Sequence, residues 1–407
     1  MPERIGTIVI GGGQAGLSVS RELTQAGVEH TVLERGRVAE TWRGRWDSFR
    51  LVTPNWSVQL PGHPYDGEDP DGFMPRDELV AYLERYAGAV EAPVRESVEV
   101  SSLRPHAGGG LELETSAGDI VASNVVLSTG AYQRPHRPAA AATFPGDLLQ
   151  IGVESYRNPG ELPAGPVLVV GSGQSGCQIA EELHEAGRDV FLACGRAGWS
   201  PRRIADRDLV WWLDAAGDFE DRVEDLPEPR ARLVANVQAS GHRGGHDLHY
   251  RTLQRMGVTL LGHFLAAEGG TVRFATDLGD SVAFGDQRNA KLMEGFRKTA
   301  ARLGLPELDL PDPGPIDTDT PELVDLSGFG AVVFAGGFRP GYGSWVHCPG
   351  AFDELGFPIH REGASTVVGG LFFVGVHFLR KRKSSLLIGV GEDAAIVARQ
   401  VAARQAA

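Results

Sequence analysis

The sequence is poor in cysteine and has no two cysteines that are separated by only two residues. Its three cysteines among 407 residues are Cys177, Cys194 and Cys348. Without a C-x-x-C pair the chain lacks the motif of a dithiol reductase, and neither a disulfide framework nor a zinc site is indicated.

Long apolar runs are also missing. The run Ile5–Ile10 is too short for a signal peptide and continues directly into glycines. No apolar stretch reaches the length that spans a bilayer. We therefore expect a cytoplasmic protein in a reducing environment, without a membrane partner.

Positive charge is scarce, because 39 Lys and Arg residues face 53 Asp and Glu residues, a formal net charge of −14. A chain this acidic is not expected to bind nucleic acid or anionic membranes through its overall field. The run Arg380–Lys383 is the local exception, and its simplest interpretation is a solvated loop. The His-rich segment Gly241–His249 lacks the spacing of helix-borne metal ligands, so we predict no metal site.

Two segments repeat one strand, turn, helix and strand pattern. In the first, Ile5–Ile10 predicts a buried strand, 15–26 a helix and His30–Leu33 a second strand. In the second, Pro166–Val170, 174–186 and Val190–Ala193 follow the same order. Because a whole supersecondary unit is repeated, we predict an α/β fold with two Rossmann-like dinucleotide-binding domains.

The first turn matches G-x-G-x-x-G and predicts an FAD site. Gly11 permits a tight turn, Gly13 lets the backbone approach a pyrophosphate, and Gly16 lets the helix pack closely on the strand. Glu34 follows 23 residues after Gly11, where a carboxylate accepts hydrogen bonds from ribose hydroxyls. The expected FAD contacts here are Gly11, Gly13, Gln14, Ala15, Gly16 and Glu34.

The second turn, Gly171–Gly176, predicts a nicotinamide nucleotide site. Arg196 stands at the end of its following strand, where the first copy has Glu34. An arginine there can pair with a 2′-phosphate, so NADPH is favoured over NADH, with Arg202 assisting. The expected phosphate contacts are Gly171, Ser172, Gly173, Gln174 and Ser175. With both nucleotides bound, NADPH would deliver hydride to the flavin.

A third segment has buried-strand patterns at Ala331–Phe334 and Leu371–Gly375 but no nucleotide motif of its own. We expect it to return to the first domain, which makes the second domain an insertion. The predicted ranges are 1–161 for the first part of the FAD-binding domain, 162–327 for the NADPH-binding domain, and 328–407 for the returning part. Trp211 and Trp212 are interpreted as core residues.

Five further segments resemble those of the class B flavin monooxygenases, and more closely the bacterial relatives of the plant auxin-forming enzymes. They are Thr41–Pro54 continuing to Gly62, Leu127–Gly130, Phe144–Pro159, Phe334–Pro340 and Gly375–Ala394. With the glycine turns they cover nearly the whole chain. The resemblance implies that the first segment lines the flavin ring, the second and fourth are hinges, and the third is the fingerprint region. The last segment would close over the flavin and bring Arg380–Lys383 near it or near a substrate entrance.

The resemblance also implies individual contacts. Thr53, Asn55 and Gln59 are candidates beside the flavin ring. Further cofactor contacts are expected at Arg35, Trp42, Val100, Gly130, Leu386 and Leu387.

The activity implied by the resemblance is an NADPH-dependent FAD monooxygenase. It would insert one oxygen atom of O₂ into a small organic substrate through a flavin C4a-(hydro)peroxide. One difference favours an alternative: aligning on Tyr156–Pro159 puts Gly152 where the fingerprint has a histidine. The alternative is an NADPH-dependent flavin oxidoreductase that reduces or dehydrogenates its substrate without oxygen insertion. A non-catalytic redox sensor is a third interpretation, and both monomer and homodimer are left open.

Overall fold

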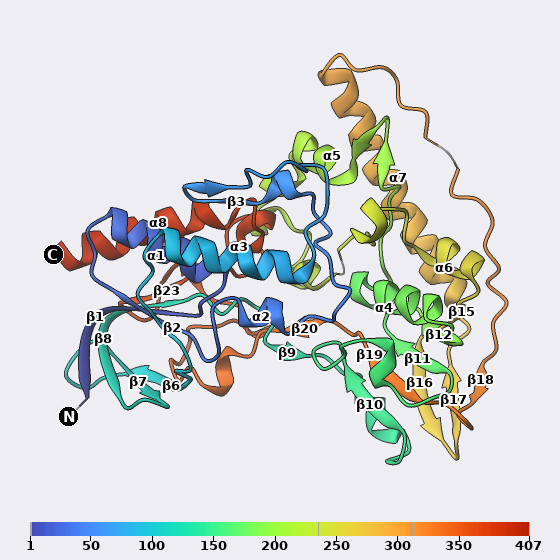
Figure 1. The fold of residues 1–407 in the computed structure, drawn as a ribbon, viewed down its shortest axis with the longest axis horizontal. Helices are drawn as coiled ribbons and strands as arrows, with labels where there is room; N and C mark the ends of the chain where they lie inside the picture. Colours follow the sequence, from blue (N-terminus) through green and yellow to red (C-terminus); the bar gives the residue numbers. More distant parts are fainter. Residues whose placement is uncertain (1, 235, 311, 407) are drawn as a thin grey trace.

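A computed structural model of the chain describes residues 2–234, 236–310 and 312–406. Its strands form two large sheets that lie in separate lobes (Figure 1). Both termini lie in the lobe that contains β1 and β8 (Figure 1). The predicted α/β fold with two Rossmann-like units is confirmed.

The first sheet has the strand order β21-β22-β23-β8-β1-β2-β5, and β7 and β6 extend from β8. Its strands are β1 (Glu3–Ile10), β2 (Thr31–Leu33), β5 (Val94–Arg95), β6 (Val100–Pro105), β7 (Leu111–Thr115), β8 (Ile120–Leu127), β21 (His360–Arg361), β22 (Ala364–Ser365) and β23 (Leu371–Phe373). Val9 of β1 lies between Val32 and Val126 in parallel register, and all three are fully buried. Continuous apolar strands of this kind are typical of parallel sheets that are covered on both faces.

The second sheet is parallel throughout, with the order β10-β19-β11-β12-β15. Its strands are β10 (Leu149–Gly152), β11 (Val167–Val170), β12 (Val190–Ala193), β15 (Thr259–Leu261) and β19 (Ala331–Phe334). All of them fall between the last long strand of the first lobe, β8, and the returning strands β21 to β23. The second unit is therefore an insertion in the first.

The strand pairing corrects the predicted domain ranges. β10 was assigned to the first domain and β19 to the returning part, yet both belong to the second sheet, where Val333 lies between Ile151 and Val169. Short apolar strands can fit either sheet, so their sequence does not say which neighbour they pair with. The chain crosses between the lobes at a two-stranded ribbon formed by β9 (Arg134–Pro135) and β20 (Phe338–Arg339).

Helices cover both sheets. α1, α3 and α8 lie along the first sheet, and α4 and α6 lie beside the second (Figure 1). The helices are α1 (Gln14–Gln25), α2 (Glu40–Arg43), α3 (Arg76–Ala89), α4 (Gln174–Glu185), α5 (Leu209–Ala216), α6 (Tyr250–Met256), α7 (Leu278–Arg302) and α8 (Val390–Ala406). No described helix is both long enough and apolar enough to cross a membrane.

α5 and α7 form a small outlying core in the second lobe. Trp212 is fully buried against Phe296, and its indole nitrogen donates to the carbonyl of Ile204. The interpretation of Trp212 as a core residue is confirmed, while Trp211 is partly buried at its edge. The smaller strands are β3 (Gln59–Leu60) with β4 (His63–Pro64), β13 (Arg203–Ile204) with β14 (Arg207–Asp208), and β16 (Phe264–Glu268) with β17 (Thr271–Phe274) and β18 (Leu323–Asp325).

After α5 the chain crosses to the first lobe, and we call residues 218–234 the crossing segment. The backbone nitrogen of Arg382 donates to the carbonyl of Asp221 at 2.8 Å. Arg232 pairs with Asp353 at 2.7 Å. The second unit therefore makes direct contacts with the returning part of the first.

Candidate functional site

The first glycine turn has the geometry of a phosphate cradle. Gly11 has a φ of 112°, and a Cβ placed on it would lie 2.9 Å from the carbonyl oxygen of Ser128. A Cβ on Gly16 would lie 1.8 Å from the oxygen of Gly11, so only glycine lets α1 approach β1 this closely. Beside Gly13, in contrast, there is no atom within 4 Å. The space that a dinucleotide pyrophosphate needs at a helix N-terminus is therefore present.

Glu34 completes this cradle from the end of β2. Its side chain is nearly buried, and its carboxylate accepts hydrogen bonds from Gly12 N at 2.6 Å and Gly36 N at 3.0 Å. These two backbone donors hold the carboxylate over the glycine turn. The acidic group that sequence placed at the ribose position is thus oriented by the cradle itself.

The second turn repeats this construction. Gly171 has a φ of 108°, and a Cβ on it would lie 2.6 Å from the oxygen of Ala335. A Cβ on Gly176 would lie 2.0 Å from the oxygen of Gly171. The hydroxyl of Ser172 accepts from Gly195 N at 2.8 Å, which connects this cradle to the loop that carries Arg196.

Both cradles open into one continuous cavity of about 2610 Å³. A single drug-sized ligand fills only about 300 to 1,000 Å³, so this cavity has room for two dinucleotides. The predicted residues that line it are Gly11, Gly13, Gln14, Ala15, Glu34, Arg35, Trp42, Thr53, Val100, Gly130, Gly171, Ser172, Gly173, Gln174, Ser175, Arg196, Arg202, Leu386 and Leu387. Gly16 packs behind the first cradle and does not line the cavity.

Two of the three candidates beside the flavin ring lie elsewhere. Asn55 is buried, and its amide donates to the carbonyl of Asp69 and accepts from Met74 N, so it holds a loop together. Gln59 is exposed and donates to the carbonyl of Trp56. Only Thr53 lines the cavity. The prediction for Asn55 and Gln59 is corrected, because adjacency in a matched segment does not fix the direction of each side chain.

Arg202 also has a different place from the one predicted. Its guanidinium is buried and pairs with Asp208 at 2.9 Å, and it donates to the carbonyl of Val52 at 2.8 Å. Burial, opposed by Asp208, lowers the pKa of Arg202 to about 10. The guanidinium is already occupied by these partners, so the assisting role at a 2′-phosphate is corrected to a structural one that links the two lobes.

The fingerprint region clamps the segment that precedes Thr53. Arg157 donates to the carbonyl of Gly44 at 2.7 Å, and its own carbonyl accepts from Asp47 N at 2.8 Å. The side chain of Asn158 donates to Asp47 at 2.7 Å. Hydrogen bonds from Arg76 and Asn158 lower the pKa of the Asp47 carboxyl, and the bond from Arg76 has the larger effect. This contact fixes the second unit against one wall of the cavity.

Gly152 ends β10 at the position where the fingerprint has a histidine. A Cβ placed on it would lie 2.1 Å from a carboxylate oxygen of Glu154. Glu154 lines the cavity at this point. A side chain at position 152 would therefore have to displace Glu154.

The basic run Arg380–Lys383 is not a solvated loop, and that interpretation is corrected. Arg380 pairs with Asp393 and Glu362, Arg382 pairs with Asp221, and Lys381 and Lys383 both pair with Glu220 and Glu392. Glu220 and Asp221 both belong to the crossing segment. The run thus binds the two units together, and Arg382 also lines the cavity.

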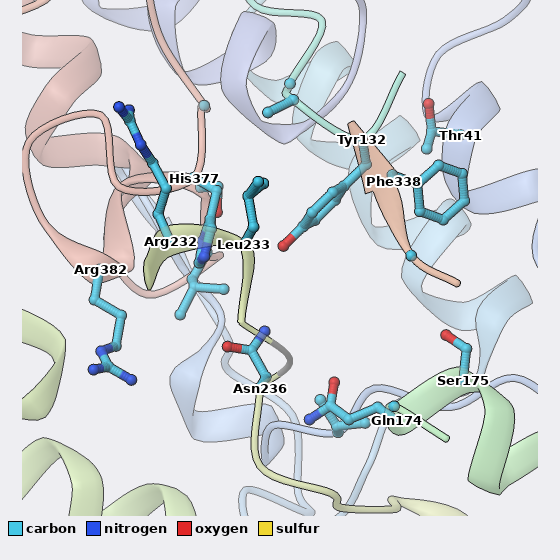
Figure 2. Close-up of a pocket in the computed structure, with 18 of the residues that line it drawn as sticks. Thr41, Tyr132, Gln174, Ser175, Arg232, Leu233, Asn236, Phe338, His377 and Arg382 are labelled. Carbon is cyan, nitrogen blue, oxygen red and sulfur yellow. The ribbon is translucent and has the colours of Figure 1, made fainter. Parts of the chain in front are cut away.

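Several cavity residues were not predicted from the sequence, among them Tyr132, His377 and Arg45. Tyr132 follows the hinge glycine Gly130 by two positions, and His377 follows Gly375 by two. Figure 2 shows Tyr132, Gln174 and Asn236 projecting toward the same space, with His377 beside it. Burial lowers the pKa of His377 to about 4, so its imidazole is neutral at neutral pH. The one sequence feature that could have indicated Tyr132 and His377 is an aromatic ring two positions after a motif glycine.

Arg45 is the third of these residues. Its guanidinium lines the cavity and lies 6.0 Å from the ring centres of Trp42 and Phe49. Burial lowers its pKa, and Tyr132 opposes this. It brings a positive charge to the cavity wall between the two cradles.

The cysteines of the described ranges lie away from the cavity. Cys177, Cys194 and Cys348 are free and buried, and none of them lines the cavity. Burial raises the pKa of each thiol. No group of three metal-ligating side chains occurs in the part of the chain that the structure describes. In the His-rich segment, His246 instead faces Glu181 at 2.6 Å.

Residues 8–239 match the pyridine nucleotide-disulphide oxidoreductase family, which is more than half of the chain. The chain belongs to this family. It is 31% identical to an uncharacterized CzcO-like oxidoreductase of Geobacillus kaustophilus, over 97% of both chains. The chain is therefore an enzyme of the oxidoreductase class.

The resemblance to flavin monooxygenases is confirmed within this family. The chain is 29% identical to the indole-3-pyruvate monooxygenase YUCCA1 of rice, over 50% of this chain and 56% of that one. The fold is similar to that of a flavin-containing monooxygenase from Stenotrophomonas maltophilia, with a TM-score of 0.69 and 20% identity over 99% of each chain.

Proposed function

We propose that this oxidoreductase binds FAD in the first cradle and NADPH in the second. Gly13 leaves open space at the N-terminus of α1, and the carboxylate of Glu34 would accept hydrogen bonds from the ribose hydroxyls of FAD. Arg196 is exposed to the cavity at the matching position of the second cradle and suits a 2′-phosphate. Both nucleotides would bind in the same cavity, so NADPH could transfer hydride to FAD without a large movement of either nucleotide.

We further propose that the enzyme is a monooxygenase acting on a small organic substrate. The observation that carries this proposal is the single cavity shared by both cradles, which no cysteine of the described ranges lines. FAD, when bound and reduced, supplies the two electrons that activate O₂. One oxygen atom enters the substrate, the other leaves as water, and NADPH is oxidised to NADP⁺. As the compartment we propose the cytoplasm.

The chain's own residues would exclude water and position the ligands. Leu233 of the crossing segment and Asn236, which follows that segment, both line the cavity opposite Tyr132 (Figure 2). The ion pairs of Lys381 and Lys383 with Glu220 keep that segment in place. An apolar lining that excludes water protects reactive intermediates from hydrolysis and side reactions.

Turnover with ¹⁸O₂ tests the proposal. NADPH-driven turnover of a panel of amines, thioethers and keto acids should give product that carries one ¹⁸O atom. The matched control is turnover of the amines and thioethers in H₂¹⁸O under ordinary O₂, which should leave their products unlabelled; keto acids are left out of this control because their carbonyl oxygen exchanges with water. Stoichiometric hydrogen peroxide without labelled product across the panel would contradict oxygen insertion.

A flavin oxidoreductase that does not insert oxygen is the second candidate. The observation that favours it is Gly152, beside which Glu154 occupies the space of a fingerprint side chain. Such an enzyme would transfer hydride from NADPH through FAD to an organic acceptor, or take hydride from a substrate. Steady turnover under anaerobic conditions with a quinone or nitro acceptor, faster than aerobic turnover on the substrate panel, would support it.

A further inference from the structure

Arg196 is the one residue that the sequence places at the 2′-phosphate of the nucleotide in the second cradle and that the structure leaves exposed there. Its side chain is exposed and lines the cavity. Arg202, the expected helper, is occupied by Asp208 and the carbonyl of Val52. A phosphate monoester carries nearly two negative charges at neutral pH, so a second cationic group beside Arg196 would match it better.

Helix α7 packs directly on the loop that follows Arg196. A Cβ placed on Gly285 would lie 3.0 Å from the carbonyl oxygen of Ala197. The amide of Asn289 donates to the carbonyl of Trp199, and the indole of Trp199 donates to Asp286 at 2.9 Å. These contacts hold one face of α7 against residues 197–199.

Arg288 lies on this same face of α7. A Cβ on Gly198 would lie 3.3 Å from the Cβ of Arg288 and 3.9 Å from its Nε, so the side chain runs along Gly198, two residues beyond Arg196. Arg288 is exposed and lines the cavity, as does Lys291 one turn further along the helix.

Neither arginine is neutralised by the chain. In residues 2–234, 236–310 and 312–406, no carboxylate lies within 4.0 Å of the guanidinium of Arg196 or Arg288. Burial raises the pKa of the Asp218 carboxyl, and the positive charge of Arg288 opposes this effect, but the two side chains form no ion pair. In a protein with a formal charge of −14, two unneutralised arginines at one edge of a nucleotide cradle indicate an anionic ligand.

We propose that Arg288 is a specificity-determining residue that binds the 2′-phosphate of NADPH together with Arg196. The proposal rests on the proposed use of the second cradle for NADPH and names the residue that completes it. Two guanidinium groups can each offer a pair of N–H donors to the phosphate oxygens. A nucleotide without the 2′-phosphate would leave both groups unpaired and would bind more weakly.

Binding of adenosine 2′,5′-bisphosphate and of 5′-AMP to the FAD-loaded protein, measured by calorimetry, tests this role without turnover. Arg288→Gln should reduce the preference for the bisphosphate over AMP by about ten- to a hundredfold, as expected for the loss of a charged hydrogen-bonding partner. Arg288→Lys should lose less, because it keeps the charge but not the planar fork. Arg297→Gln is the matched control, because Arg297 is exposed on α7 and does not line the cavity.

The Arg196→Gln variant separates two kinds of failure. If it lowers the preference while Arg288→Gln does not, Arg288 has no role and the proposal is overturned, but the NADPH assignment stands. If neither variant changes the preference, the 2′-phosphate does not bind here, and both the proposal and the NADPH assignment fail. Unfolding temperatures of all variants, expected to equal that of the parent protein, exclude loss of the fold as the cause.

Discussion

At the residue scale, the glycines of the first cradle have two different roles. Gly16 allows α1 to pack against β1, where a Cβ would lie 1.8 Å from the oxygen of Gly11. Gly13 has an extended backbone that other residues also adopt, with φ −90° and ψ −171°, and no atom within 4 Å of a Cβ. Glycine is needed at position 13 because the absence of a side chain leaves open space for a ligand.

This difference predicts opposite outcomes for two alanine variants. Gly13→Ala should have the unfolding temperature of the parent protein when both are free of FAD, but should bind FAD at least about tenfold more weakly, because the methyl group occupies the space of the pyrophosphate. Gly16→Ala should lower the free energy of unfolding by several kcal/mol, because the helix has to move away from the strand. Thermal unfolding and flavin absorbance measure both effects. A Gly13→Ala protein that retains its flavin would show that the pyrophosphate does not approach here.

A second prediction at this scale concerns His377. The folded protein holds its pKa at about 4, against about 6.5 in the unfolded chain. Stability is therefore complete above pH about 6.5 and is lost as the pH falls toward 4, because only the unfolded chain gains a proton there, for a total of about 3 kcal/mol. Urea unfolding of His377→Asn should show a smaller loss of stability between pH about 7 and about 4.5 than the parent protein.

The exposed histidine His347 provides the control for this measurement. His347→Asn should keep the pH dependence of the parent protein. An unchanged pH dependence in His377→Asn would show that folding does not shift the pKa of this imidazole.

At the scale of elements, a network of ion pairs holds the crossing segment to the first lobe. Glu220, in the turn Asp218–Glu220, pairs with Lys381 at 2.6 Å and Lys383 at 2.5 Å, and Arg382 pairs with Asp221 at 2.8 Å. Exposed ion pairs are weak individually and are screened by salt, although a network can be stronger. We therefore expect this element to be the part of the cavity wall that opens most readily.

Glu220→Gln tests this expectation. Backbone amides of residues 218–234 should exchange hydrogen faster in the variant, with the protection of β11 and β12 unchanged, because only the local contact is lost. Raising the salt concentration should have the same effect on the parent protein. Glu224→Gln is the control, because Glu224 has one weak contact, with Arg222 at 3.7 Å. Equal protection in the Glu220 and Glu224 variants would contradict a role for the network.

At the scale of the whole molecule, two nucleotide sites on two units predict separate contributions to stability. A ligand that binds only the folded state stabilises it by about 2.7 kcal/mol at a hundredfold excess over its dissociation constant. We expect NADP⁺ to raise the unfolding temperature of the FAD-loaded protein, and also that of Gly13→Ala without FAD. If NADP⁺ stabilises only the FAD-loaded protein, the second cradle is not an independent site.

Local sequence was sufficient for both cradles, because a glycine turn between a strand and a helix is defined by residues close together in the chain. The parallel strands at Ala331–Phe334 and Leu371–Phe373 were also recognisable from their apolar runs.

Only the tertiary structure decided which sheet each short strand joins and which charged groups remain available. β19 pairs with β11 in the second sheet although it follows that strand by more than 150 residues. Arg202 and Arg288 have the same side chain, yet Asp208 neutralises the first and the second faces the cavity. Ion pairing depends on distance in space, so a motif can name a position for a cation but cannot tell which arginine is free to bind there.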